Sequence, residues 1–367
     1  MTNKEIILHI NCNYYKNAVH KNLINGLDEV YENVVYSPTK SITNLNENIY
    51  IVKAFSKYDS FFFNIKQQKI LRQFYLKVNI KDNIALIHGH TLFTDGNVAY
   101  TLAQKKAIPL VITVRSTDLT FLKYRPFLRR KGIKILNYAS KIIFLSKSAK
   151  NSFFNNYCSK KYKEEFDNKS TVIPSGIDNF WIINRDKHEK DKNKIRVICA
   201  SKINRNKNAI STCKALKKLQ KDGYSVSFKL VGECVKKYIL NKILKYDFVT
   251  YLPKLDKNEL IFEYRCSDIF VMPSHRETFG LVYAEAMSQG LPVIYSKGQG
   301  FDGQFDDGLV GYAVKSKNYV ELSNKVLDTY NNYNNLSNNS FRYCLNFDWK
   351  YLINEFLSSY KESIKGE

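Results

Sequence analysis

The sequence predicts an α/β protein with two doubly wound halves, each a parallel sheet with helices on both faces, and three observations predict this. The chain has 367 residues, which at about 150 residues per domain allows two or three domains. Short apolar runs alternate with longer amphipathic stretches, as in repeated strand and helix units. A turn at 172–178 and the polar tract NRDKHEKDKNK separate two such series.

Apolar runs in the first half predict buried strands at 5–10, 83–88, 109–114 and 141–145. Between the first two runs, residues 44–79 are aromatic and basic, and their apolar side chains recur at helical spacing. We therefore expect helices that cover the sheet over 44–79.

The second half repeats the alternation. Strands are expected at 195–200, 226–231, 248–252, 268–273 and 291–296, and helices at 206–221, 256–264 and 281–289. An amphipathic helix is expected at 349–360. The resulting domains are 1–173 and 195–345, with a linker at 174–194 and a C-terminal helical segment, 346–367, for which packing back on the first domain is one option.

Charge points to an anionic partner. The chain has 57 Lys and Arg against 34 Asp and Glu, a net charge of +23. Nucleotide phosphates, anionic lipid and nucleic acid all fit that field, and a solvated surface without a partner is the alternative. The basic and aromatic segments 56–77 and 123–131 are candidates for contact with an anionic membrane surface.

The seven cysteines show no paired spacing, so neither a disulfide framework nor a zinc site is expected. The apolar run at the N-terminus is short and is interpreted as a first strand. No run approaches the ~18 apolar residues of a membrane span. We expect a cytoplasmic protein, with peripheral attachment to the inner face of the cytoplasmic membrane left open.

The most informative segment is 274–290, SHRETFGLVYAEAMSQG. A strand leads into a polar loop, and the turn at Gly280 opens a helix whose first N–H groups lack partners within the helix, which favours a phosphate. Glu277 and Glu285 flank this site, and two carboxylates suit hydroxyls or a developing cation better than a phosphate. A sugar nucleotide offers both. The alternative is that both are ordinary acids at the start of a helix.

Two further clusters follow strands. Lys202, Arg205 and Lys207 crowd the loop after the strand at 195–200, where they would clamp a diphosphate; a solvated basic turn is the alternative. In the first half, His88 and His90 end one strand and Arg115 and Asp118 follow another.

These four side chains would meet at one sheet edge, with a histidine as hydrogen-bond donor or base. A structural histidine is the alternative, and metal binding would need further ligands. Residues 11–17 lack the glycines of a nucleotide-binding loop, which disfavours hydride chemistry and P-loop hydrolysis.

Four motifs resemble the retaining nucleotide-sugar glycosyltransferases of family 4, which have the GT-B fold of two Rossmann-like domains facing a central cleft. The strongest is the E-x7-E motif, E-T-F-G-L-V-Y-A-E at 277–285. The others are V-I-P-S-G-I-D at 172–178, L-V-G-E at 230–233 and D-I-F-V-M-P-S at 268–274. Ser175 stands where the family has Asn.

The resemblance implies a role for each candidate residue. Glu277 and His90 would be catalytic, Glu285 would bind the ribose, and Arg115 and Asp118 would lie on the acceptor or leaving-group side. The donor diphosphate would contact Lys202, Lys207, Phe279, Gly280 and Leu281. Lys202 stands where Arg is common, and Arg115 where the family has His. Neither a metal nor another cofactor is implied.

The activity implied is transfer of a sugar, with retention, from a nucleotide-sugar donor to a saccharide or a polyprenyl-diphosphate-linked saccharide. Surface polysaccharide assembly is the expected setting, with the first domain on the acceptor side, the second binding the donor, and no nucleic-acid partner. Two alternatives stay open. One is a sugar-nucleotide epimerase of the same fold; the other is a non-catalytic module that binds polyanions or membrane surfaces, which the net charge favours and the glutamate pair opposes.

Overall fold

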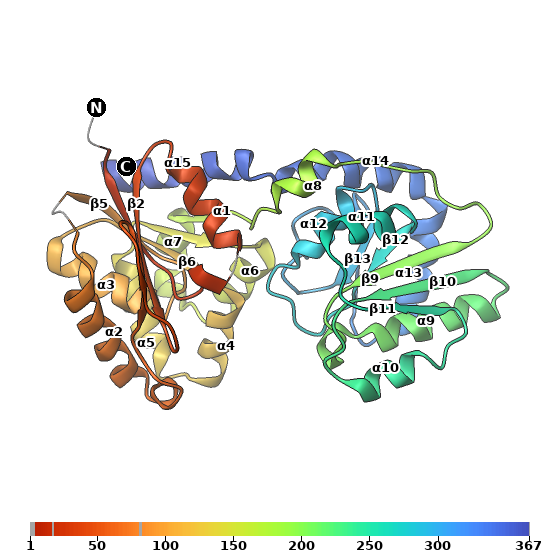
Figure 1. The fold of residues 1–367 in the computed structure, drawn as a ribbon, viewed down its shortest axis with the longest axis horizontal. Helices are drawn as coiled ribbons and strands as arrows, with labels where there is room; N and C mark the ends of the chain where they lie inside the picture. The colour runs from red at the N-terminus through yellow and green to blue at the C-terminus, as the bar shows by residue number, and fades with distance from the viewer. Residues whose placement is uncertain (1–3, 17, 81–82, 367) are drawn as a thin grey trace. The chain divides into compact units, whose positions relative to one another are not determined.

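The computed structural model describes residues 4–16, 18–80 and 83–366, so the expected domain ends at residues 1 and 367 lie outside it. The chain divides into two compact units (Figure 1). The first comprises Met1–Leu145, Ala149–Asp178 and Trp349–Glu367, and the second comprises Ser146–Ser148 and Asn179–Asp348. Each unit contains one sheet.

The first sheet has eight strands in the order β3-β4-β2-β1-β5-β6-β7-β8. All neighbours are parallel except β3 and β4. The strands are β1 (Ile6–Ile10), β2 (Glu32–Thr39), β3 (Asn44–Leu45), β4 (Ile49–Lys53), β5 (Ile84–Gly89), β6 (Leu110–Val114), β7 (Lys141–Phe144) and β8 (Ser170–Val172). Because parallel strands end at the same edge, the loops after β1, β5 and β6 lie together there.

Helices cover both faces of this sheet, as alternation along β1 shows. Ile6, Leu8 and Ile10 belong to one apolar cluster, whereas Ile7 belongs to another. The helices on the side of the first cluster are α2 (Phe63–Lys77), α3 (Gly96–Lys106), α4 (Ser116–Tyr124), α5 (Leu128–Tyr138), α6 (Lys147–Asn156) and α7 (Lys160–Asn168). The helices of the second cluster are α1 (Ala18–Leu27) and α15 (Trp349–Lys365).

The prediction of helices throughout 44–79 is wrong in its first part. That part forms the strands β3 and β4, and only Phe63–Lys77 is an α-helix, after the short 3-10 helix η2 (Tyr58–Phe61). The run Ile49–Val52 is apolar and rich in β-branched residues, a composition that favours a strand over a helix. The aromatic composition of the whole segment obscured this shorter pattern.

The second sheet has six parallel strands in the order β11-β10-β9-β12-β13-β14. They are β9 (Ile195–Ala200), β10 (Val226–Val231), β11 (Val249–Leu252), β12 (Ile269–Val271), β13 (Val293–Ser296) and β14 (Gly311–Val314). The strands expected at 195–200 and 226–231 are confirmed residue for residue. The helices are α8 (Asn179–Ile183), α9 (Ala209–Lys221), α10 (Lys237–Ile243), α11 (Lys257–Arg265), α12 (Leu281–Met287), α13 (Tyr319–Asn331) and α14 (Tyr333–Tyr343).

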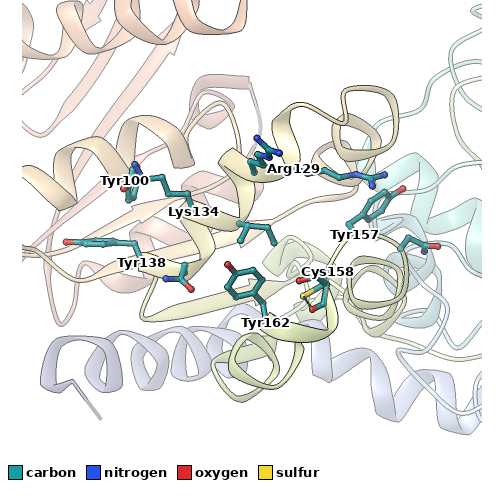
Figure 2. Close-up of a pocket in the computed structure, with 12 residues that line it drawn as sticks. Tyr100, Arg129, Lys134, Tyr138, Tyr157, Cys158 and Tyr162 are labelled. Carbon is teal, nitrogen blue, oxygen red and sulfur yellow. Dashed lines mark hydrogen bonds between the residues drawn. The ribbon is translucent and has the colours of Figure 1, made fainter.

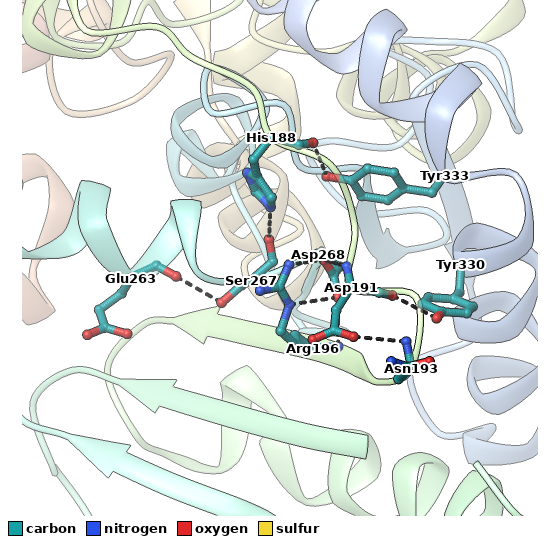
Figure 3. Close-up of polar contacts among 9 residues, drawn as sticks. All are labelled: His188, Asp191, Asn193, Arg196, Glu263, Ser267, Asp268, Tyr330 and Tyr333. Carbon is teal, nitrogen blue, oxygen red and sulfur yellow. Dashed lines mark hydrogen bonds and ion pairs between the residues drawn. The ribbon is translucent and has the colours of Figure 1, made fainter. Parts of the chain in front are cut away.

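The polar tract before β9 is held against the second unit by a buried carboxylate (Figure 3). Asp268 is fully buried and accepts two hydrogen bonds from the guanidinium of Arg196, at 2.7 and 3.1 Å. It also accepts one from the backbone N–H of Asp191, at 3.2 Å. Tyr330 donates to the carbonyl of Asp191 and Tyr333 to that of His188. The tract is therefore fixed although its composition is that of a solvated loop.

The last helix, α15, is part of the core of the first unit. Leu352, Ile353, Phe356 and Tyr360 pack in one cluster with side chains of α1 and of the central strands. Within the described ranges, no helix is both long and apolar enough to cross a bilayer.

The α15 helix also constrains the segment 172–178. A Cβ atom at Gly176 would lie 2.6 Å from ring atoms of Trp349, the first residue of α15. We therefore expect Gly176→Ala to destabilise the protein by about 1–3 kcal/mol, the usual cost of overfilling a packed site. Urea unfolding monitored by circular dichroism measures this. Adding Trp349→Leu should recover part of the loss, and a Gly176→Ala variant as stable as the parent would contradict the packing argument.

Candidate functional site

Two loops meet at the carboxyl edge of the second sheet and are joined by one side chain. Asn206, in the loop after β9, donates from Nδ2 to the carbonyl of Arg276 at 2.8 Å and accepts at Oδ1 from the N–H of Arg276 at 3.0 Å. Its backbone carbonyl accepts from the N–H of His275 at 2.8 Å. The loop after β9 is thus fastened to the loop after β12.

These hydrogen bonds bring the ammonium group of Lys207 next to the carboxylate of Glu277. Lys207 Nζ lies 2.5 Å from Glu277 Oε2, and the two side chains are only 22% and 12% exposed. The two residues are 70 positions apart in sequence. Removing one partner of a shielded ion pair leaves an uncompensated charge with little water around it, so Lys207 and Glu277 depend on each other or on another ion that takes the partner's place.

A third loop fixes the backbone around Glu277. Gln299 Oε1 accepts from the N–H of Glu277 at 3.0 Å, and the N–H of Gly300 donates to the carbonyl of Glu277 at 3.1 Å. A Cβ atom at Gly300 would lie 2.1 Å from the carbonyl oxygen of Thr278, so only glycine permits this approach. The loop after β13 therefore holds the Glu277 loop from the other side.

The other donor-side candidates are dispersed along this edge. Gly280 has φ +85° and immediately precedes α12, while Phe279 is buried against the rings of Phe301 and Phe347. Leu281 and Glu285 lie on α12, both half-buried. Lys202 is not part of the Lys207 pair. Its side chain is 69% exposed, and its Nζ lies 3.5 Å from Glu233.

The first-sheet candidates meet at their own carboxyl edge. Asp118 accepts from the backbone N–H groups of Leu92, Phe93 and Arg115, at 2.9 to 3.3 Å. Burial raises the pKa of the Asp118 carboxyl to about 6. Arg115 donates from Nε to the carbonyl of His90 at 2.9 Å. Asp118 therefore orders the loop after β5 and the start of α4, and Arg115 is tied to His90 through the backbone.

The His90 ring belongs to a buried cluster that includes His9 and His88. Asn33 Nδ2 donates to a carboxylate, so its Oδ1 faces His9 and His9 donates to it from Nε2, at 2.9 Å. His9 Nδ1 is then the acceptor for His90 Nε2–H, at 3.0 Å.

His88 contacts Tyr360 Oη at 2.6 Å and Thr113 Oγ1 at 2.8 Å. Burial lowers the pKa of His9 to about 4 and that of nearby His20 to about 3, so the cluster is neutral at pH 7.

The geometry of this cluster does not suit a metal ion, although nitrogen atoms of His9, His88 and His90 lie within 4.8 Å of one another. His88 and His90 are stacked, with ring centroids 4.0 Å apart and planes inclined by 26°. A metal binds in the plane of an imidazole, so stacked rings cannot both direct a lone pair at one ion. Both ring nitrogens of His88 also have hydrogen-bond partners.

Sequence reasoning missed several residues at the two edges. Asp95 is fully buried, accepts from the N–H of Cys12 at 3.0 Å, and has its pKa raised to about 6 by burial. Asn206, Gln299 and His9 were missed as well. His9 offered a signal, because a histidine within an apolar strand needs a buried partner. Asn206 and Gln299 offered none, since polar loop residues are common.

Family models match most of the chain. Residues 18–179 match Glycosyltransferase Family 4, and residues 182–342 match Glycosyl transferases group 1. An uncharacterized glycosyltransferase of Methanocaldococcus jannaschii is 27% identical over 291 residues, covering 77% of this chain and 76% of that protein.

Solved structures show the same fold. A sucrose-phosphate synthase from Thermosynechococcus elongatus has a TM-score of 0.76 at 16% identity, covering 99% of this chain and 100% of that one. HepE from Anabaena, in complex with UDP and glucose, has a TM-score of 0.67 at 16% identity, covering 98% and 100%. The fold is therefore GT-B, as the sequence predicts. The chain is a nucleotide-sugar-dependent glycosyltransferase whose first half matches the family 4 model and whose second half matches the group 1 model.

The neutral histidine cluster has a measurable pH signature. A histidine whose pKa falls from 6.5 to about 4 on folding opposes folding below pH 6.5, by about 2 kcal/mol at pH 5 for His9. His9→Gln keeps one donor and one acceptor but does not titrate. We expect the stability advantage of the parent over His9→Gln to shrink by about this amount between pH 7.5 and pH 5.

Denaturant unfolding of both proteins at each pH gives this difference. Asp95 and Asp118 titrate with the opposite sign but occur in both proteins, so their effects cancel. An advantage that stays constant with pH would show that His9 is not held neutral.

Proposed function

We propose that this protein transfers a sugar from a UDP-sugar to a saccharide or lipid-linked saccharide, with retention at the anomeric carbon. The observation that carries the proposal is the shielded Lys207–Glu277 ion pair at the carboxyl edge of the second sheet. A structural neighbour with UDP and glucose supports the choice of donor. The setting we propose is the assembly of a surface polysaccharide.

In this proposal Lys207 exchanges its contact with Glu277 for the donor diphosphate. Lys202, exposed beside Glu233, reaches the same diphosphate from the rim. Backbone groups of Phe279, Gly280 and Leu281 approach the phosphates where glycine leaves space. On α12, Glu285 accepts from the ribose hydroxyls. The half-buried position of Glu285 suits a neutral, hydroxyl-bearing partner.

The proposed reaction is a displacement at the anomeric carbon, and charged side chains assist it. The bond from the anomeric carbon to the β-phosphate oxygen breaks, and the phosphate keeps the electron pair. Lys207 stabilises the negative charge that develops there. The acceptor oxygen bonds to the same face of the anomeric carbon and gives its proton to the leaving phosphate. Glu277, released from Lys207, stabilises the positive charge on the sugar. No metal takes part in this proposal.

The first unit supplies the acceptor side. Arg115 is a cation held at that edge, where Asp118 accepts from its backbone N–H and the His90 carbonyl accepts from its Nε. The predicted catalytic role of His90 stays a prediction. Its backbone carbonyl also accepts from Arg115 Nε and so helps to position that side chain.

A lipid-linked acceptor requires contact with a membrane, and the turn between α4 and α5 is suited to it. Phe121 and Tyr124 at the end of α4 and Phe127 just before α5 are exposed, and Phe127 by 69%. Lys123 and Arg125 lie over the rings of Tyr124 and Phe121, at 5.5 and 5.4 Å. Exposed aromatics beside cations favour the interface of an anionic bilayer.

The two glutamates should affect different kinetic constants. Glu277→Gln removes a charge that acts as the sugar becomes cationic, so we expect kcat to fall at least a hundredfold with little change in donor affinity. Glu285→Gln weakens an acceptor of ribose hydroxyls, so donor binding should weaken by about 1–3 kcal/mol. Calorimetric titration with UDP and UDP release from each common UDP-sugar give the two readouts.

Thermal unfolding of both variants controls for misfolding. If Glu277→Gln lost only affinity, or Glu285→Gln bound UDP normally, the assigned role would be wrong. If the parent released UDP from no UDP-sugar in the presence of saccharide acceptors, the proposed function itself would fail.

Membrane contact should depend on the α4–α5 turn. We expect the protein to sediment with vesicles containing phosphatidylglycerol but not with pure phosphatidylcholine vesicles, and to be released by high salt, because the screening length falls from ~8 Å at physiological salt to ~3 Å at 1 M. Replacing Lys123, Arg125 and Phe127 by Gln, Gln and Ser should markedly reduce sedimentation with these vesicles. Lys161→Gln with Lys163→Gln, which removes two exposed charges from α7, is the matched control. Equal loss in both variants, or equally salt-sensitive binding to duplex DNA, would mean a general polyanion effect.

A further inference from the structure

A groove in the helical layer of the first unit lies between the side chains of α3, α5 and α7 and the end of α6 (Figure 2). Its volume is about 1030 Å³, comparable to sites that hold sizeable ligands. Four tyrosines line it, Tyr100, Tyr138, Tyr157 and Tyr162. Of the described residues around it, Ile133 is the one aliphatic side chain.

The tyrosine rings are held in place before any ligand arrives. Tyr138 donates to the carbonyl of Ala103 at 3.0 Å and packs edge-on against Tyr100, with centroids 5.4 Å apart. Tyr162 stacks on Phe166, with planes inclined by 15°. Such fixed rings cost a ligand little ordering entropy. The negative face of an aromatic ring attracts the weakly positive C–H groups of a sugar ring.

The groove is cationic. Arg129, Arg130 and Lys134 line it, all from α5, and the twelve described lining residues include no Asp or Glu. Arg129 lies over the ring of Tyr157 at 5.5 Å, and Lys134 over that of Tyr100 at 5.7 Å. Like charges on neighbouring turns of one helix repel, and an anion between them relieves the repulsion.

We propose that this groove binds an acidic saccharide, a short run of sugar rings with carboxylate groups. The rings stack on the tyrosines, the carboxylates pair with Arg129 and Lys134, and the amides of Asn137 and Asn156 reach hydroxyls. A lipid chain would need more aliphatic lining than Ile133 provides. The inference rests on the proposed function in one respect. The saccharide would be part of the acceptor or product chain, remote from the reacting hydroxyl.

Calorimetric titration of the full chain with tetragalacturonate, without any donor, tests this. We expect binding that is at least tenfold tighter than that of neutral maltotetraose. Arg129→Gln with Lys134→Gln should weaken it about tenfold or more, and Tyr157→Ala should weaken it as well. Tyr157→Phe, which keeps the ring, should bind normally. The matched control is Lys53→Gln with Lys57→Gln, exposed in the first unit and outside the groove, which should bind within twofold of the parent.

Several results would overturn the proposal. Equal weakening in the control pair would show that the overall charge, not the groove, attracts the anion. If neutral maltotetraose bound as tightly as tetragalacturonate, the cations of the groove would have no role in recognition. Phosphatidylglycerol vesicles bound through Arg129 and Lys134, without tetragalacturonate binding, would assign the groove to lipid. Thermal unfolding confirms that each variant is folded. Because no donor is present, failure of UDP release would refute the proposed function and leave this result standing.

Discussion

The carboxyl edge of the second sheet depends on the hydrogen bonds that join the loop after β9 to the loop after β12, most of them made by Asn206. Asn206 uses its backbone carbonyl and both side-chain groups to hold His275 and Arg276, much as a short strand pairs with its neighbour. Lys207 follows directly in sequence and Glu277 follows Arg276. These hydrogen bonds therefore set the distance between the charges of Lys207 and Glu277, which lie far apart along the chain. Asn208, which donates from Nδ2 to the carbonyl of Pro273 at 3.0 Å, joins the same two loops, so the two charges are held next to each other.

The two sheet edges differ in the ionisation of their buried and half-buried side chains. The second unit keeps the Lys207–Glu277 ion pair partly shielded from water, so exchanging one partner for another ion would change the electrostatic energy of the site. The first unit buries histidines in neutral form and satisfies them with Asn33, Thr113 and Tyr360. Because these histidines are neutral at pH 7, they add no positive charge near Arg115.

The sequence predicted the buried strands well because a strand covered on both faces is a continuous apolar run. It failed where a strand contains polar residues, as in β2, or precedes an aromatic helix, as in β4. The candidate site was predicted in part. Lys202 and Lys207 have the same charge and nearly the same surroundings in sequence, yet one pairs with Glu233 and the other with Glu277. Tertiary geometry alone decides between them.

The position of α15 has a consequence for how the chain is made. Leu352, Ile353, Phe356 and Tyr360 complete the core around Ile7 and Leu86, but a ribosome delivers them only after the whole second unit. The second unit, nearly all of it within 179–348, has emerged before that helix exists. Domains usually mature in the order of their synthesis. Synthesis of the first unit starts before that of the second, but its core is complete only when α15 has emerged. Until then the apolar face that α15 will cover is open, and a chaperone would meet that face on the nascent chain.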